Sequence, residues 1–369
     1  MSKGGRLILL MERFLDGDEI WISIAFSGIF LYYVLNMLTP LPVRTARSGW
    51  AFCFYVGTLL EQYTKQPLSY EEQLQLLRDR GLLVEDDSKA LHLLHHISYY
   101  RLSGYWHPLL QQPKHLHRFK PNASFNNAFK LYCFDRELRQ LVLGEIEKIE
   151  VAVRAQMINT LSLAFGPTWY ADKQRFTNHR YGHDRTLQKL LDDFRNSQEE
   201  FIVAFRKKYA DNYPPCWMIM EIASFGQIST LYSGLKGGRS KRAIAHHFGL
   251  DDTSFASWLH CIVYLRNLCA HHSRFWNREF GISPQMPNTS FLSRNRLTRE
   301  SIFSIKGSHG KLNSRAYYML SILLYLLQTV NPKSSFRQKF FLLVNKYPNI
   351  DLAAMGFPST LENEALWEG

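Results

Sequence analysis

The fold of this chain is decided by residues 125–163, which read FNNAFKLYCFDRELRQLVLGEIEKIEVAVRAQMINTLSL. Apolar side chains recur there three and four positions apart, which is the spacing of one face of an α-helix. The positions of this face are Phe134, Leu138, Leu141, Val142, Ile146, Ile149 and Val153. The pattern predicts one long helix, which the pair Gly166-Pro167 ends.

The segments on both sides of this helix are also helical in pattern. Ser69 followed by Glu72 has the spacing of a capping box, and the helix that it opens runs to Leu77. A second helix starts at residues 86–88, and the two could form a DNA-reading helix–turn–helix or an ordinary packed pair, of which the packed pair is favoured. Further helices are expected at 187–209, 217–235, 314–330 and 335–346, and a bend rich in aromatic residues at 98–108. The rings of the bend could stack on bases or seal a core, and the core is favoured. No β-sheet pattern or repeat is evident, so the prediction is an all-α body.

The composition is that of a globular and strongly basic protein. Hydrophobic residues make up 46% and charged residues 21% of the 369 positions, and the net charge is +12. This charge favours a polyanionic partner, with nucleic acid first and an acidic membrane surface second. The basic residues gather in three expected loops, at 111–124, 172–185 and 281–313. The five cysteines include no C-x-x-C pair, which argues against a disulfide framework or a zinc ribbon and favours a reducing, cytoplasmic compartment.

The N-terminal segment differs from the rest of the chain. Residues 20–38, IWISIAFSGIFLYYVLNML, carry no charge and are close to the length needed to cross a bilayer. Three interpretations stay open: a membrane anchor, a hydrophobic helix on the body, or an upstream extension that is not normally translated. The last two are favoured over the anchor. We therefore divide the chain into an N-terminal extension, 1–62, and a helical body, 63–369.

The strongest candidate for a functional site lies in residues 258–278, WLHCIVYLRNLCAHHSRFWNR. Here Arg266 and Asn267 are followed by His271 and His272. An imidazole can move a proton near neutral pH, and a guanidinium can hold a phosphate with two hydrogen bonds. An apolar helical stripe carries the motif; it consists of Leu259, Ile262, Val263, Leu265 and Leu268. Similar spacings at Arg242/His247, Arg239/His246 and Arg101/His107 show that spacing alone is weak evidence.

Other features have a structural and a functional interpretation. Glu147, Glu150 and Arg154 are neighbours on a helix, either as a surface ion-pair ladder or as residues that orient the histidine helix. Cys269 is expected to be a small buried residue rather than a nucleophile. The pair Gly237-Gly238, followed by three basic residues, could cradle a phosphate, although no nucleotide-loop spacing is present.

Taken together, the ordered blocks from about Leu68 to Trp367 resemble the Abi family of bacterial abortive-infection proteins, of the AbiD/AbiF type. The blocks are LSYEEQLQLLRDRGLLV, YYRLSGYWHP, FDRELRQLVLGEIEKIEVAVRAQM, YLRNLCAHHSRFWNR and YPNIDLAAMGFPSTLENEALW. Similar proteins begin close to the first block, so the N-terminal extension departs from the family pattern. The resemblance implies the HEPN superfamily, whose helical bundles commonly carry an R-x4-6-H ribonuclease motif. The expected fold is a HEPN-like helical bundle with additional helices and long basic loops.

The resemblance implies a phage-defence endoribonuclease that needs no metal or cofactor. Its site would consist of Arg266, Asn267 and His271, with His272 as a substitute for His271, and it would leave a 2′,3′-cyclic phosphate. The implied partners are RNA, a second copy of the chain in a homodimer, and an antitoxin or regulatory RNA. Two alternatives remain: an RNA-binding module without catalysis, and a membrane-associated defence protein that acts through residues 20–38.

Overall fold

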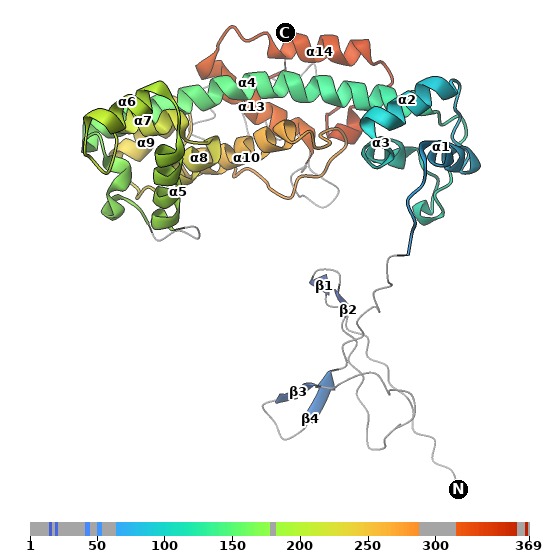
Figure 1. The fold of residues 1–369 in the computed structure, drawn as a ribbon, viewed down its shortest axis with the longest axis horizontal. Helices are drawn as coiled ribbons and strands as arrows, with labels where there is room; N and C mark the ends of the chain where they lie inside the picture. The colour runs from blue at the N-terminus through green and yellow to red at the C-terminus, as the bar shows by residue number, and fades with distance from the viewer. Residues whose placement is uncertain are drawn as a thin grey trace. The chain divides into compact units, whose positions relative to one another are not determined.

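The computed structural model describes residues 64–177, 182–287, 315–359 and 366–367, together with four short strands closer to the N-terminus (Figure 1). The chain divides into two units, Met1–Leu68 and Ser69–Gly369. In the first unit, β1 (Leu15–Asp16) pairs antiparallel with β2 (Glu19–Ile20), and β3 (Leu41–Arg44) pairs antiparallel with β4 (Trp50–Cys53). Of the uncharged segment 20–38, only Ile20 is described, as part of β2, and the remainder lies outside the described residues. None of the helices in the described ranges is both long and apolar enough to span a bilayer.

The second unit is all-α, as the sequence predicts. Its first helices are α1 (Tyr70–Asp79), α2 (Asp87–Ile97), α3 (Tyr99–Trp106), α4 (Phe125–Phe165), α5 (His183–Asn196) and α6 (Glu200–Lys208). They are followed by α7 (Cys216–Ile222), α8 (Phe225–Gly234), α9 (Arg239–His247), α10 (Asp252–Ala270), α13 (Ala316–Val330) and α14 (Phe336–Lys346). Short 3-10 turns connect several of them, including η1 (His107–Leu109) and η2 (Lys114–Leu116).

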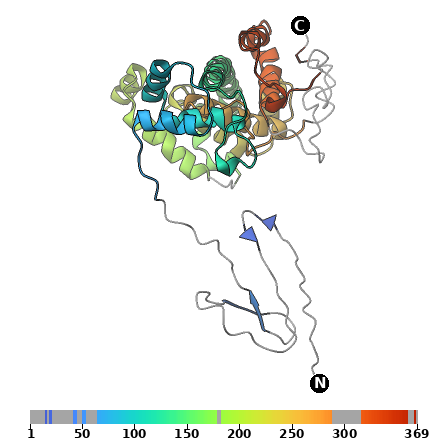
Figure 2. The ribbon, with the colours of Figure 1, turned by 90° about the vertical axis from the view of Figure 1, so that its right-hand side faces the viewer.

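Helix α4 is the axis of this unit. Ser124 caps its first turn by accepting a hydrogen bond from the Asn127 amide, and Gly166 ends it with a φ of 86° that a side chain would disfavour. Every predicted position of its apolar face is buried except Leu141, which is half-buried. Helices α10 and α13 run along one side of α4 and α14 along another, while α1–α3 and α5–α9 occupy its two ends (Figures 1 and 2).

The pair α1–α2 forms with the predicted capping box. The Glu72 amide donates to the Ser69 hydroxyl at 3.2 Å, and the Glu72 carboxylate accepts from the Ser69 amide at 2.7 Å. Both helices contribute to one small core with α3 and the start of α4, in which Leu77 and Leu94 are fully buried. The structure therefore contains the packed helix pair that the sequence favours.

The structure differs from two sequence predictions and refines a third. Residues 98–108 form helix α3 rather than a bend, because Ser98 caps the first turn and Pro108 lies beyond the last. The single helix predicted over 217–235 is two, α7 and α8, because Ser224 and Gln227 form a second capping box. The pattern over 187–209 likewise belongs to two helices, α5 and α6.

Candidate functional site

Helix α10 carries the candidate motif at its C-terminal end. Asp251 caps its start, accepting hydrogen bonds from the amides of Thr253 and Ser254. Its apolar stripe packs on α4, α8, α9 and α13, and the whole predicted stripe from Leu259 to Leu268 is buried. Trp258, at the start of this stripe, donates its indole N–H to the Gln285 carbonyl at 2.8 Å. Because other helices pack against α10 on several sides, the position of its last turn is fixed.

The four motif residues differ in exposure. Arg266 is half-buried, whereas Asn267, His271 and His272 are exposed. The Arg266 guanidinium donates to the Asn267 side-chain oxygen at 3.3 Å, so these two side chains are in contact. Asn267 and His271 are four residues apart and lie on the same helix face. Within the described residues, no hydrogen bond joins the side chains of Arg266 and His271.

The helix ends at His271 in a Schellman motif. The Ser273 amide donates to the Leu268 carbonyl at 3.0 Å, and the His272 amide donates to the Cys269 carbonyl at 3.1 Å. His272 occupies the position that glycine usually takes, with a φ of 56°. A non-glycine residue in this left-handed region is strained, so the backbone of His272 carries a conformational cost.

A buried carboxylate fixes the chain immediately after the motif. Asp135 of α4 accepts hydrogen bonds from the amides of Phe275 at 3.1 Å and Trp276 at 2.5 Å. It also accepts from the Tyr105 hydroxyl at 2.6 Å and pairs with Arg139. Burial raises the pKa of Tyr105 and the charge of Asp135 raises it further, so this hydroxyl remains a donor. The network ties α3, α4 and the segment after α10 together at one point.

Two arginine hydrogen bonds join α3 to residues 272–274, the segment that follows α10. Arg101 of α3 donates to the backbone carbonyl of His272 at 2.8 Å, and Arg274 donates to the carbonyl of Gly104 at 2.6 Å. Gly104 faces the Arg274 side chain, whose Cδ would lie 3.7 Å from a Cβ at that position. The pair Arg101/His107, which the sequence presents only as a competing match, thus lies beside the main motif.

Positive charge accumulates around this connection. Partial burial lowers the pKa of His107, and the nearby charges of Lys114, Arg274 and His117 lower it further. We call Arg101, His107, Lys114, His117 and Arg274 the basic rim. It brings one of the predicted basic loops, 111–124, to the motif. Of the loop 172–185, residues 172–175 lie at the other end of α4, and of 281–313 only residues 281–287 are described.

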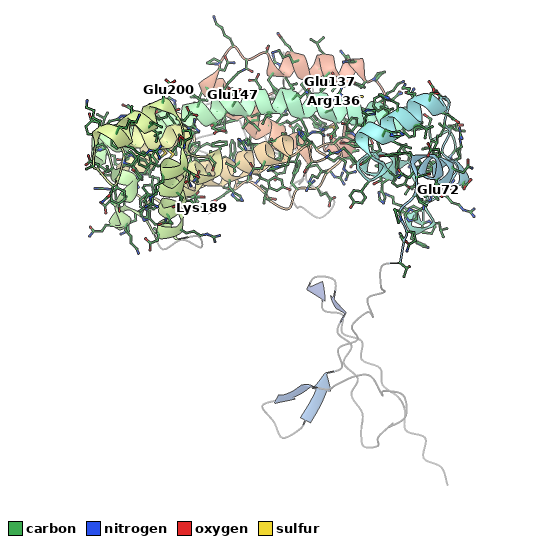
Figure 3. All side chains as sticks on the ribbon, in the orientation of Figure 1. Glu72, Arg136, Glu137, Glu147, Lys189 and Glu200 are labelled. Atoms are coloured by element: carbon green, nitrogen blue, oxygen red, sulfur yellow. The ribbon has the colours of Figure 1, made fainter. Side chains whose placement is uncertain are left out.

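The charged residues Glu147, Glu150 and Arg154 of α4 do not orient the C-terminal end of α10, which carries the histidines. Arg154 pairs with Glu150 at 3.0 Å and donates to the Ala223 carbonyl at 3.1 Å, while Glu147 is exposed (Figure 3). Arg154 is 19 residues from Asp135 on one helix, which corresponds to about 28 Å. Of the predicted surface ladder, the described residues contain the half-buried pair Glu150–Arg154, and Glu147 forms no ion pair there. Cys269 is buried, and burial raises the pKa of its thiol to about 12, so it is not a thiolate at neutral pH.

Sequence reasoning missed Tyr105, Asp135 and Arg139. A signal was present, because Asp135 and Arg139 flank the apolar positions Phe134 and Leu138 of α4, and charged residues on a core-facing stripe require partners.

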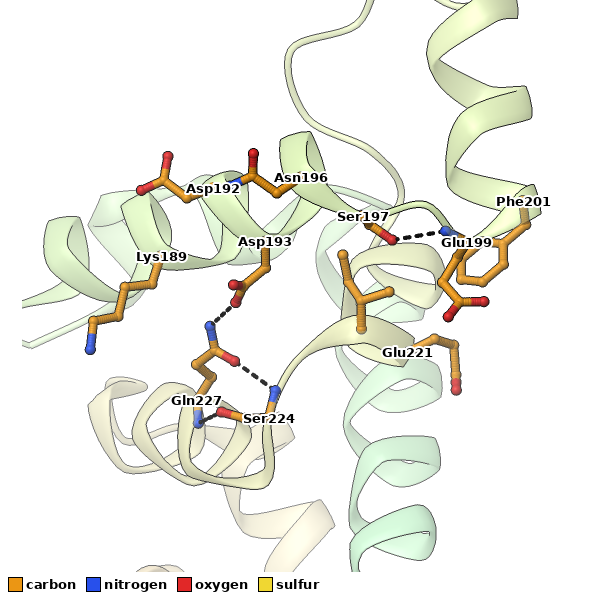
Figure 4. A pocket seen from close by; sticks show the side chains of 11 residues that line it. Lys189, Asp192, Asp193, Asn196, Ser197, Glu199, Phe201, Glu221, Ser224 and Gln227 are labelled. Carbon is orange, nitrogen blue, oxygen red and sulfur yellow. Dashed lines mark hydrogen bonds between the residues drawn. The ribbon is translucent and has the colours of Figure 1, made fainter.

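A cavity of about 1070 Å³ lies elsewhere in the described part of the chain, between α5, α7 and α8 (Figure 4). There Gln227 donates to the Asp193 carboxylate at 2.6 Å and completes the capping box with Ser224. No motif residue lines this open cleft, and three of its polar residues, Asp193, Ser224 and Gln227, are hydrogen-bonded to one another. We therefore place the candidate site at the exposed end of α10, which matches the chemistry of the motif better than the cleft does.

Comparison with known proteins gives one match. A model of the family described as Abi-like protein matches residues 92–277, which is half of the chain and includes α3, α4 and α10 with the motif. No curated protein and no solved structure matches the chain. The matched residues contain the three elements that the Asp135 network joins, and this protein belongs to the Abi-like family.

Proposed function

We propose that this protein is a metal-independent endoribonuclease of phage defence, with its active site on Arg266, Asn267 and His271. Membership of the Abi-like family itself suggests a role in abortive infection. The observation that carries the ribonuclease proposal is the exposure of Asn267 and His271 beside Arg266, on a helix end held by both α3 and α4. The proposal includes membership of the HEPN superfamily, as an AbiD/AbiF-type protein.

The proposed reaction is an internal transesterification of RNA. His271 removes the proton of a ribose 2′-hydroxyl, the 2′-oxygen attacks phosphorus, and the bond from phosphorus to the 5′-oxygen breaks. The leaving oxygen takes a proton from a histidinium, and the products are a 2′,3′-cyclic phosphate and a 5′-hydroxyl. Arg266 binds the phosphate and stabilises the charge that develops on it, and Asn267 holds the guanidinium through the contact at 3.3 Å.

The test is cleavage of a labelled RNA in EDTA, with analysis of both new ends. A substrate with a single 2′-deoxyribose at the cleavage position should resist, because it lacks the nucleophile. His260→Ala removes an exposed histidine from the same helix and is the matched control for His271→Ala. Cleavage of the 2′-deoxy substrate, or a 3′-hydroxyl product, would refute this mechanism.

We also propose that the active site is completed in a homodimer. One chain supplies an Arg266 and a His271 that make no direct hydrogen bond, and a second copy would contribute another pair. Mixed dimers of Arg266→Ala and His271→Ala chains should then recover part of the activity that each variant lacks. A fully active wild-type monomer, measured by light scattering at the assay concentration, would contradict the shared site.

A second candidate is an RNA-binding module without catalysis. The basic rim favours it, since the cations Arg101, Lys114 and Arg274 suit a phosphate backbone whether or not a bond is cut. RNA that is bound but not cleaved by the wild-type protein, with binding lost on charge reversal at Lys114, would support this candidate instead.

A further inference from the structure

A second cavity, of about 310 Å³, lies where the end of α4 meets the start of α9. We call it the α9 cavity. Its lining includes three apolar side chains, of which Leu161 and Leu235 are buried and Phe165 is exposed. Its rim carries four cations, Arg175, Lys236, Arg239 and Lys241, against one carboxylate, Asp172. This excess of positive charge in a concave site indicates an anionic ligand.

Arg175 is held in place before any ligand arrives. Its guanidinium lies over the Phe165 ring at 4.0 Å, and its Nε is 3.0 Å from Asp172. Its backbone carbonyl accepts the Lys236 amide at 2.8 Å, which joins the two basic segments of the rim. A stacked, anchored guanidinium loses little conformational freedom on binding an anion, and its outer nitrogens match two phosphate oxygens.

Lys241 makes no salt bridge within the described residues, although the charge of Asp252 favours its charged form and its Nζ lies 5.4 Å from the centre of the Tyr232 ring. Its Nζ donates to the carbonyls of Ser233 at 3.1 Å and Leu235 at 2.8 Å, and burial lowers its pKa. No carboxylate of the described residues lies within ion-pair distance of Lys241. An ammonium has three donors, so one remains for a ligand. A half-buried cation without an anion is costly, and a bound phosphate would offset this cost.

The backbone at the rim is open to a ligand. No atom lies within 4 Å of the place where a Cβ would stand on Gly237 or Gly238. Gly238 precedes α9, whose first turn has no capping side chain. The amides at this helix start can therefore contribute hydrogen bonds in addition to the four side chains.

We propose that the α9 cavity binds the phosphate group of a nucleotide-sized ligand, with the base against the apolar side chains of its lining. The volume is at the small end of ligand pockets. Leu161 is 26 residues from Asp135 along α4, or about 39 Å, so the cavity is separate from the Arg266 motif. The inference does not depend on the ribonuclease proposal.

The test measures binding to the full-length chain by calorimetry at constant ionic strength. The probes are inorganic phosphate, a nucleoside 5′-monophosphate and the matching nucleoside. We expect the monophosphate to bind at least about tenfold more tightly than the nucleoside. Arg239→Glu and Lys236→Glu should each weaken it about tenfold, while Arg242→Glu, on the same helix outside the cavity, should change it less than about twofold.

Several results would overturn the assignment. Equal affinities for nucleoside and monophosphate would exclude a phosphate site. An equal loss of monophosphate affinity in Arg239→Glu and Arg242→Glu would mean that only the overall charge of the protein matters. Binding of RNA oligonucleotides but not of monophosphate would make the cavity part of an RNA path. By contrast, unchanged RNA cleavage by Arg239→Glu is the result that we expect, because the cavity is separate from the Arg266 motif.

Discussion

Asp135 on α4 accepts a hydrogen bond at 2.5 Å from the backbone amide of Trp276, 141 residues later in the chain. The contact joins the central helix to the segment that leaves the candidate motif. Asp135 also binds Tyr105 and Arg139. The position of residues 275–276, just after the motif, therefore depends on one buried carboxylate.

Replacement of this carboxylate should destabilise the protein strongly. Asp135→Ala leaves the buried Arg139 charge and two amides without their acceptor, and removal of one partner of a buried pair costs about 3–5 kcal/mol. The measurement is the free energy of unfolding in urea. Asp211→Ala, at an exposed carboxylate, should change it by less than about 0.5 kcal/mol. Equal effects of the two variants would show that the network does not hold the loop.

Because the backbone of His272 is strained, replacement of this residue by glycine is expected to increase stability. His272→Gly should stabilise the fold by about 0.5–1 kcal/mol, because relief of left-handed strain exceeds the entropy that glycine adds to the unfolded chain. RNA cleavage should fall only mildly, since His272 lies beyond the end of α10 in the left-handed conformation and is not on the helix face of Asn267 and His271. Asn122→Gly, at another left-handed residue, is the control for the gain in stability. A less stable His272→Gly protein would contradict the strain argument.

RNA affinity should depend on the basic rim and on salt. Counterion release makes the logarithm of affinity fall linearly with the logarithm of salt concentration, and each lost phosphate contact reduces the slope by about one. Lys114→Ala should show this reduction, while Lys189→Ala, at the opposite end of α4, should keep the wild-type slope. Filter binding at several salt concentrations measures both slopes. If the affinity does not vary with salt, the rim does not bind RNA phosphates.

The N-terminal extension should be dispensable for the fold of the helical body. A truncated chain that begins at Tyr63 keeps every residue of the unit Ser69–Gly369. It should remain soluble and unfold at the same urea concentration as the full chain. Aggregation of the truncated protein, with the full-length protein soluble, would mean that residues 20–38 belong to the core.

Local signals predicted much of the fold, and long-range contacts account for what was missed. The Ser69–Glu72 capping box and the apolar face of α4 are encoded within a few residues, and both formed as expected. Helix α3 was not predicted, because Gly104 and Pro108 look like breaks in sequence, whereas tertiary contacts with Arg274 and Asp135 support it. The sequence was sufficient to select the motif residues, but it did not predict which residues of α3 and α4 contact the segment after them. Nothing local in the sequence links Arg101 to a residue 171 positions later.

The central claim is that Arg266 and His271 act on one transition state, and a double-mutant comparison of RNA cleavage in EDTA tests it most directly. Acid–base catalysis alone typically contributes about 10²–10⁴-fold. Arg266→Ala, His271→Ala and the double variant should therefore all fall to a similar low rate with normal circular dichroism, because residues that act as a unit do not add. Wild-type cleavage by both single variants would contradict the ribonuclease proposal. Loss of cleavage only in His272→Ala would move the catalytic assignment by one residue.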